Sequence, residues 1–212
     1  MFHRPHFTPL IPARLTDPSR LRYPLYLSPT VDGVRCSIHP ELGPVSRNGN
    51  EVQNRRLKQQ FADARLHGFD GEIAVGPPNV PEVLAKTIAA AMVLGTKPVD
   101  FVFFVSDDFT DPRLPFSLRI KFAQARVEAL AVSWVEVLPH RLVKDAPAMF
   151  RTYEQFLTYG FAGGVLRDPN GRYRCGRATE ASGLAITIEP AEAVTRHREI
   201  VLARQRRTAK LH

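Results

Sequence analysis

Apolar positions recur along the chain with two periods, and the period predicts which segments are helical and which are extended. In segment 52–66, Leu57, Phe61 and Ala64 follow the i, i+4, i+7 spacing between charged residues, which predicts an amphipathic helix. Segment 100–106 is mainly a run of aromatic and β-branched residues, which is typical of a buried strand. The same criteria predict further helices at 81–93, 117–130 and 148–159, and further strands at 69–75, 132–138, 163–167 and 184–188. Segment 26–38 is predicted to be either a pair of strands or a strand that runs into a turn.

These elements alternate without the regular spacing of βαβ units. The order therefore predicts an α+β fold with largely antiparallel sheets flanked by helices. With 212 residues, of which 44% are hydrophobic, the chain is long enough to bury one substantial core. We expect an irregular Pro-rich segment at 1–22, one domain at 23–192 and a basic tail at 193–212.

Basic residues exceed acidic ones, which gives a formal net charge of +8 and a sequence pI of about 9.9. An excess of this sign favours polyanionic partners, and nucleic acid is the commonest of these inside cells. After Glu192 the tail has a single acidic residue, Glu199, beside a basic cluster of Arg196, Arg198, Arg204, Arg206, Arg207 and Lys210. The tail is either a phosphate-contacting arm or simply a solvated terminus.

Several classes of protein are disfavoured by what the sequence lacks. It has no apolar run of membrane-spanning length, and charged and proline residues interrupt its first segment where a signal peptide would lie. We therefore expect a cytoplasmic protein without a membrane partner. Cys36 and Cys175 form no CxxC pair and the histidines are scattered, so no metal site is expected.

The residues with candidate chemistry fall into short motifs in a fixed order. They are Thr30-Val31-Asp32-Gly33-Val34-Arg35, Ser46-Arg47-Asn48-Gly49, Asp70-Gly71-Glu72, the aromatic run 101–104 before Asp107-Asp108-Phe109, the segment 162–167 and the segment 183–190. Each motif alone is weak, since Asp-Gly and Asn-Gly pairs are ordinary turn sequences. The ordered set resembles the nucleotidyltransferase domain of ATP-dependent DNA ligases, most closely the small phage enzymes, over residues 23–192.

The resemblance implies a role for each motif in binding a nucleotide. Arg35 and Arg47 would hold ribose and phosphate groups, because the planar guanidinium binds phosphate in a bidentate way. Glu72 would bind the ribose or a metal ion, and Phe103 or Phe104 would stack on adenine. Asp32, Gly33 and Arg167 complete the retained set.

The chain departs from the family pattern at the positions that carry the chemistry. Thr30 occupies the place of the lysine nucleophile, and a threonine hydroxyl cannot form the phosphoramidate that the lysine forms. Ala162 replaces a metal-binding glutamate, and Thr187 and Glu189 replace two lysines that neutralise the triphosphate. The family's oligonucleotide-binding barrel would need more than the roughly twenty residues that follow this last motif.

We therefore expect a catalytically inactive ligase-like protein that binds nucleic acid, in particular nicked or broken DNA. One alternative is a protein-interaction role, inhibitory or structural, for a phage protein located in the host cytoplasm. The other is an active ATP-dependent nucleotidyltransferase with a non-standard nucleophile. No cofactor is expected. Binding of ATP or AMP should be weak, because each lost charge-assisted contact costs about 1.5–3 kcal/mol.

Overall fold

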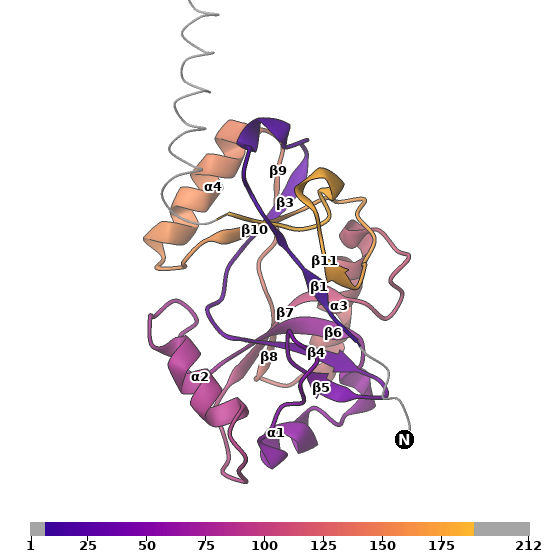
Figure 1. Ribbon diagram of the computed structural model, residues 1–212, viewed down its shortest axis with the longest axis vertical. Coiled ribbons are helices and arrows are strands. Elements are labelled where there is room, and N and C mark those ends of the chain that lie inside the picture. Colours follow the sequence, from indigo (N-terminus) through magenta and orange to yellow (C-terminus); the bar gives the residue numbers. More distant parts are fainter. Residues whose placement is uncertain (1–6, 189–212) are drawn as a thin grey trace, which may run out of the picture.

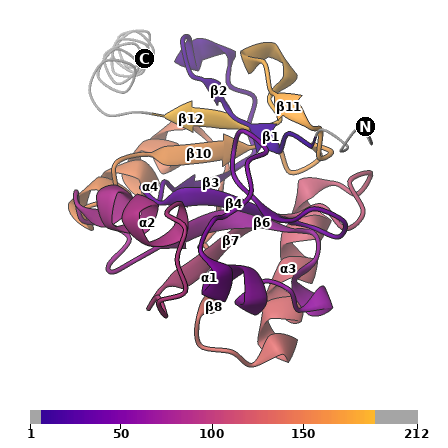
Figure 2. The same ribbon diagram turned by 60° about the horizontal axis from the view of Figure 1, so that its bottom comes forward.

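The computed structural model describes residues 7–188, and its two main sheets lie in separate layers (Figures 1 and 2). The first sheet has the strand order β5 (Gly43–Val45), β4 (Val34–His39), β6 (Phe69–Ala74), β7 (Val102–Asp108), β8 (Val135–Val137). The second has the order β2 (Ala13–Arg14), β12 (Ile186–Ile188), β10 (Gly164–Arg167), β3 (Leu25–Pro29), β9 (Arg141–Val143). A short parallel pair, β1 (Leu10–Ile11) with β11 (Gly176–Arg177), lies beside them.

Helices cover one face of each sheet. The helices α1 (Arg55–Gln60) and α3 (Phe116–Leu130) pack on the first sheet, where Phe61 and Phe116 join Phe103 in a core of fully buried side chains. The helix α4 (Ala146–Thr158) packs on β3 and β9 through Met149 and Tyr153. The helix α2 (Val83–Ala91) contacts β4 and β6, and three 3₁₀ turns lie at Pro18–Arg20, Ala64–Leu66 and Glu180–Ser182.

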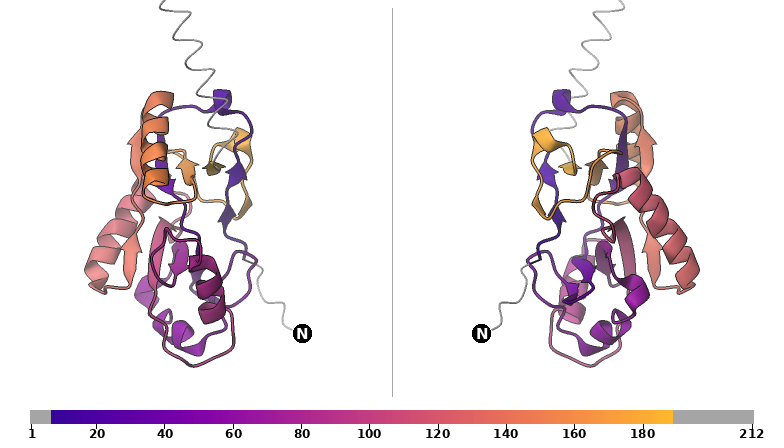
Figure 3. Two further views of the ribbon diagram at one scale, coloured as in Figure 1. Left: turned by 90° about the vertical axis from the view of Figure 1, so that its left-hand side faces the viewer. Right: turned by 90° about the vertical axis from the view of Figure 1, so that its right-hand side faces the viewer.

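This architecture confirms the predicted α+β fold. Within residues 7–188, six strand pairs are antiparallel and three are parallel, so the sheets are largely antiparallel. Figure 3 shows α3 and α4 along one side of the molecule and the strands β1 and β2 along the opposite side. On the side of β1 and β2, strands and not helices therefore cover the space between the two sheets.

Two expectations need correction. The helix predicted at 52–66 is broken, because Asn54 caps α1, Phe61 ends it, and Asp63 caps a separate 3₁₀ turn through its own carboxylate. Segment 1–22, expected to be irregular, contains β1 and β2 within its described part. These strands have only two residues each and pair with distant strands, so they produce no local periodicity. The basic tail at 193–212 lies outside the described residues.

Candidate functional site

A cleft of about 410 Å³ opens between the two sheets. The segment 9–14, here called the strap, crosses it and contributes β1 and β2. The remaining lining comes from both sheets and from β11, and the full set is Pro9, Leu10, Ile11, Pro12, Arg14, Thr30, Arg35, Arg47, Glu72, Val165, Arg177 and Thr187. The cleft thus brings together residues that the sequence motifs had indicated, such as Arg35, Arg47 and Glu72. It also contains two arginines that the motifs had not indicated, Arg14 and Arg177.

Strand register explains why Arg35 and Glu72 share the cleft. They are directly paired on β4 and β6, and cross-strand partners project from the same face of a sheet. Arg35 is held by a bidentate pair with Asp70, with its Nε and Nη2 atoms 2.8 and 2.6 Å from the carboxylate oxygens, and its Nη1 lies 3.4 Å from Glu72. Its guanidinium is therefore fixed by the fold before any ligand arrives.

Asp70 is fully buried and accepts two further hydrogen bonds. Ser37 donates its hydroxyl at 2.6 Å and Tyr173 donates its phenol at 2.8 Å. The Leu10 N–H in turn donates to the Tyr173 oxygen at 3.0 Å. Burial raises the pKa of Tyr173 well above its usual value, and the Asp70 charge adds to this, so the phenol remains a donor. The network connects the strap to the floor of the cleft.

Glu72 has an unusual proton affinity for a carboxyl group. Burial raises its pKa to about 7, Arg35 opposes that rise, and the Asp70 charge adds to it. The carboxyl group therefore changes charge close to neutral pH. An anion entering the cleft would favour its protonated form, because like charges repel.

Arg167 lies beneath the cleft in a second buried network. Asp107 pairs with Arg119 through distances of 2.8 and 3.0 Å and with Arg167 at 2.8 Å, and all three side chains are at most 2% exposed. Burial alone would raise the pKa of Asp107, but Arg167 and Arg119 outweigh it and hold that pKa below its usual value. This network ties β10 of one sheet to β7 of the other.

Thr30 lies at the end of β3, where its N–H donates to the carbonyl of Gly163 at 3.0 Å. Its side chain lines both the cleft and a deeper hollow of about 50 Å³, which Ser106 and Arg167 also line. Within residues 7–188, the Thr30 Oγ1 and Arg167 Nε atoms are buried there without a hydrogen-bond partner. The position that the resemblance assigns to the nucleophile thus carries a hydroxyl at the floor of the cleft.

The two glycines beside these motifs are required by close backbone contacts. A Cβ atom on Gly33 would lie 2.3 Å from the carbonyl oxygen of Ile73, and one on Gly163 would lie 2.5 Å from that of Ile188. Asp32 is exposed in the same turn as Gly33. The Asp-Gly motif therefore has a structural explanation of its own, which is the close approach of the turn to β6.

The aromatic candidates do not line the cleft. Phe103 is fully buried in the core of the first sheet, with its ring centroid 5.2 Å from that of Phe61 in an edge-on arrangement. Phe104 projects from the same face as Glu72 but belongs to a separate buried cluster with Val31, Val83 and Leu138. The residue of β7 that lines the deeper hollow is Ser106.

Among the positions that depart from the family pattern, Thr187 lines the cleft, Ala162 is exposed, and Glu189 lies outside the described residues. The resemblance implies a divalent metal ion held partly by a glutamate at position 162. The donors found here do not fit one, because the side chain of an alanine has no ligand oxygen and Glu72 is paired with Arg35. No cluster of three or more potential ligand side chains for a metal occurs between residues 7 and 188.

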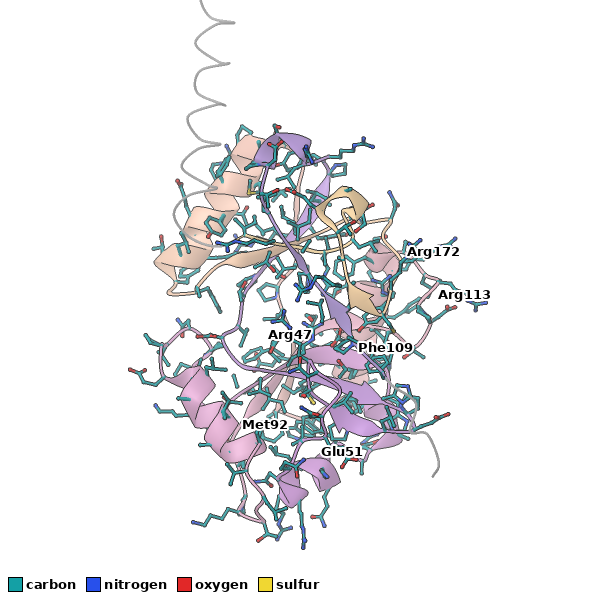
Figure 4. The ribbon with its side chains drawn as sticks, in the orientation of Figure 1. Arg47, Glu51, Met92, Phe109, Arg113 and Arg172 are labelled. Atoms are coloured by element: carbon teal, nitrogen blue, oxygen red, sulfur yellow. The ribbon has the colours of Figure 1, made fainter. Side chains whose placement is uncertain are left out.

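Sequence reasoning missed Arg14 and Arg177. Arg14 pairs in register with Thr187 on β12, and Arg177 lies on β11 beside the strap. Both strands have two residues, so neither has an alternating pattern that could have placed these side chains. Figure 4 shows Arg47 near the space between the two sheets, whereas Arg113 and Arg172 project from the edge of the molecule.

Comparison with solved structures identifies the fold. Chlorella virus DNA ligase-adenylate superposes with a TM-score of 0.75 at 21% identity, covering 87% of this chain and 69% of the other. The ATP-dependent DNA ligase of bacteriophage T7, in complex with ATP, gives 0.59 at 15% identity, covering 87% and 69%. The ligase domain of LigD from M. tuberculosis gives 0.59 at 18% identity, covering 86% and 59%.

The chain therefore has the fold of the nucleotidyltransferase domain of ATP-dependent DNA ligases. No protein-family profile matches its sequence, and no curated protein does either. Between residues 7 and 188, no helix has both the length and the apolar character that a membrane crossing requires.

Proposed function

We propose that this protein binds nucleic acid, in particular nicked or broken DNA, in the arginine-lined cleft and does not catalyse nucleotidyl transfer. One observation carries the proposal: four arginines line a cleft whose floor has Thr30 where the resemblance implies a lysine nucleophile. Guanidinium groups bind phosphate through paired N–H donors, and a polynucleotide end presents phosphates at its surface.

The cleft supplies binding groups but not a reactive amine. No lysine of residues 7–188 is among its lining side chains. Lys58, one candidate for a substitute nucleophile, has its amine 2.8 Å from Glu51, and neither residue lines the cleft. A nucleophile must lie close to the phosphorus that it attacks, so the described lysines do not support transfer chemistry.

The direct test is a binding titration against nicked, intact and single-stranded DNA carrying 5′-phosphates, at low and at physiological salt. We expect nicked DNA to bind most tightly, with affinity falling as salt rises because counterions are released on binding. Arg47→Ala and Arg177→Ala should weaken this binding. The matched control is Arg172→Ala, which removes an exposed arginine from the edge of the molecule.

If all three DNA forms bind equally weakly and binding vanishes at physiological salt, the proposal fails. An unchanged affinity in both cleft variants would show that DNA binds elsewhere on the protein, for example through the basic tail. That result would preserve nucleic-acid binding and reject the cleft as its site.

A second candidate function is protein interaction, and one surface favours it. Beside α3 lies a hollow of about 360 Å³ lined by Leu114, Phe122, Ala125 and Ala129 among others, and the Phe122 side chain is 51% exposed. Apolar surface of this kind marks contact sites for proteins more often than for nucleic acid. Loss of a partner from Phe122→Ser, with DNA binding retained, would support this function.

A further inference from the structure

The chemistry of the cleft lining is suited to one part of a nucleotide. Its charged or hydrogen-bonding side chains are Arg14, Arg35, Arg47, Arg177, Glu72, Thr30 and Thr187, and its other side chains are aliphatic or proline. An arginine side chain only donates hydrogen bonds, so it suits the oxygen atoms of a phosphate group, which accept them. Within the described lining there is no asparagine, no glutamine and no aromatic ring.

Two of the arginines are available for a ligand. The side chains of Arg47 and Arg177 are exposed and make no hydrogen bond or ion pair within residues 7–188. Arg35 differs, because Asp70 already occupies two of its nitrogen atoms and Glu72 lies near a third. A phosphate in the cleft would therefore gain its strongest contacts from Arg47 and Arg177.

The space beneath the cleft does not suit a base. The deeper hollow has a volume of about 50 Å³, which is about the liquid volume of one or two water molecules. Its buried Thr30 hydroxyl and Arg167 Nε are groups that such waters would satisfy. Phe104, whose ring projects from the same face of the sheet as Glu72, is 9% exposed within a buried cluster with Val31, Val83 and Leu138, and so offers little stacking surface.

We propose that the cleft binds phosphate groups and does not discriminate between nucleobases. This inference rests on the proposed function and deepens it, because it names the part of the ligand that is bound. The shared chemistry is a run of phosphates, supplied either by a polynucleotide end or by a free polyphosphate. Adenine adds nothing to binding, and any affinity for ATP comes from its triphosphate.

The test is isothermal titration calorimetry of the whole chain with tripolyphosphate, ATP, GTP and adenosine in a magnesium-free buffer. We expect tripolyphosphate, ATP and GTP to bind with dissociation constants within about threefold of one another, and adenosine not to bind, because the contacts are charge-assisted bonds to phosphate. Binding of ATP that is more than about tenfold tighter than both tripolyphosphate and GTP overturns the proposal. Binding of adenosine overturns it as well, and so does the absence of binding by all three phosphate ligands.

Variants assign the binding to the cleft. Arg47→Ala and Arg177→Ala should each weaken all three phosphate ligands by about tenfold or more, whereas Arg172→Ala should leave them within about twofold. The three positions are exposed, so the variants should fold, and an unchanged melting temperature checks this. Equal effects of all three substitutions would mean that phosphate responds to overall charge, and the proposal would be rejected.

The DNA titration separates this inference from the function on which it rests. DNA binding that depends on Arg47, without any binding of tripolyphosphate, ATP or GTP, rejects the inference and keeps the proposed function. Base-independent binding of free polyphosphate that depends on Arg47 and Arg177, without any binding of DNA, keeps the inference and rejects the proposed function.

Discussion

Removing the Asp107 carboxylate should destabilise the protein strongly, because it leaves two arginines buried without their shared partner. Asp107 is fully buried, and Arg119 and Arg167 are each 2% exposed, so water cannot replace the lost charge. Breaking a buried ion pair by deleting one partner costs about 3–5 kcal/mol. With a urea dependence of about 2–3 kcal/mol per molar, Asp107→Ala should lower the unfolding midpoint by about 1–2.5 M.

Loss of the Asp107 carboxylate should leave Arg119 and Arg167 with different numbers of remaining hydrogen-bond partners. Arg119 also donates from Nη1 to the carbonyl oxygens of Leu114 at 2.6 Å and Gly171 at 2.8 Å. Within residues 7–188, Asp107 is the one carboxylate that pairs with Arg167. In the Asp107→Ala background, Arg167→Met should therefore recover more stability than Arg119→Met, because it removes the more poorly compensated buried charge.

The matched control is the exposed pair between Asp111 and Arg113 on the loop before α3. Asp111→Ala should leave the urea midpoint unchanged, since exposed ion pairs contribute little. A loss below about 1 kcal/mol in Asp107→Ala, or an equal recovery by the two methionine substitutions, would refute the assignment of this cluster as the connection between the sheets.

Four further predictions concern the cleft and its motifs. The pKa of Glu72 is raised from its usual value of 4.5 to about 7 in the folded protein, so between these pH values the native state holds a proton that the unfolded state has lost. The free energy of unfolding should therefore fall as the pH rises from about 4.5 through 7. Glu72→Gln should therefore raise the melting temperature at pH 8 and not at pH 4, and an equal effect at both would contradict the assignment. Gly33→Ala should destabilise by about 1–3 kcal/mol in urea unfolding, because its Cβ atom would meet the carbonyl of Ile73; wild-type stability would refute that contact. Intact mass should detect no AMP adduct with ATP or NAD and magnesium or manganese. Detection of such an adduct on the wild-type protein would contradict this expectation. The Thr30→Lys, Ala162→Glu variant should have a lower melting temperature than wild type, because a lysine at position 30 would introduce a charge at the cleft floor. A higher melting temperature would contradict that reasoning.

Local patterns predicted the sheets well because the main strands carry their own signal. Arg35 and Glu72 each fall on a segment predicted as a strand, and the observed register pairs those strands and brings both residues into the cleft. Neighbouring strand positions face opposite sides of a sheet, so at least one of Phe103 and Phe104 must face the core. Alternation could not show that the other ring also lies in a buried cluster, with Val31, Val83 and Leu138. That cluster joins distant parts of the chain, which sequence spacing does not specify.

The parts that sequence did not predict depend on long-range pairing. Arg14 and Arg177 enter the cleft because two-residue strands are completed by hydrogen bonds to partners far along the chain. The helix predicted at 52–66 was too long because local side-chain caps, and not long-range pairing, were overlooked. Asn54 and Asp63 are strong local caps within an apolar pattern that periodicity alone treats as continuous.

The strap has a consequence for the order in which the protein forms during synthesis. Its Leu10 N–H bonds to Tyr173, which is 163 residues further along the chain, and its strands pair with β11 and β12. Segment 9–14 must therefore wait, unpaired, until nearly all of the described chain has left the ribosome. Contacts this distant close slowly. The first sheet and its helices can fold earlier, so a nascent chain would have packed its first sheet before the cleft had formed.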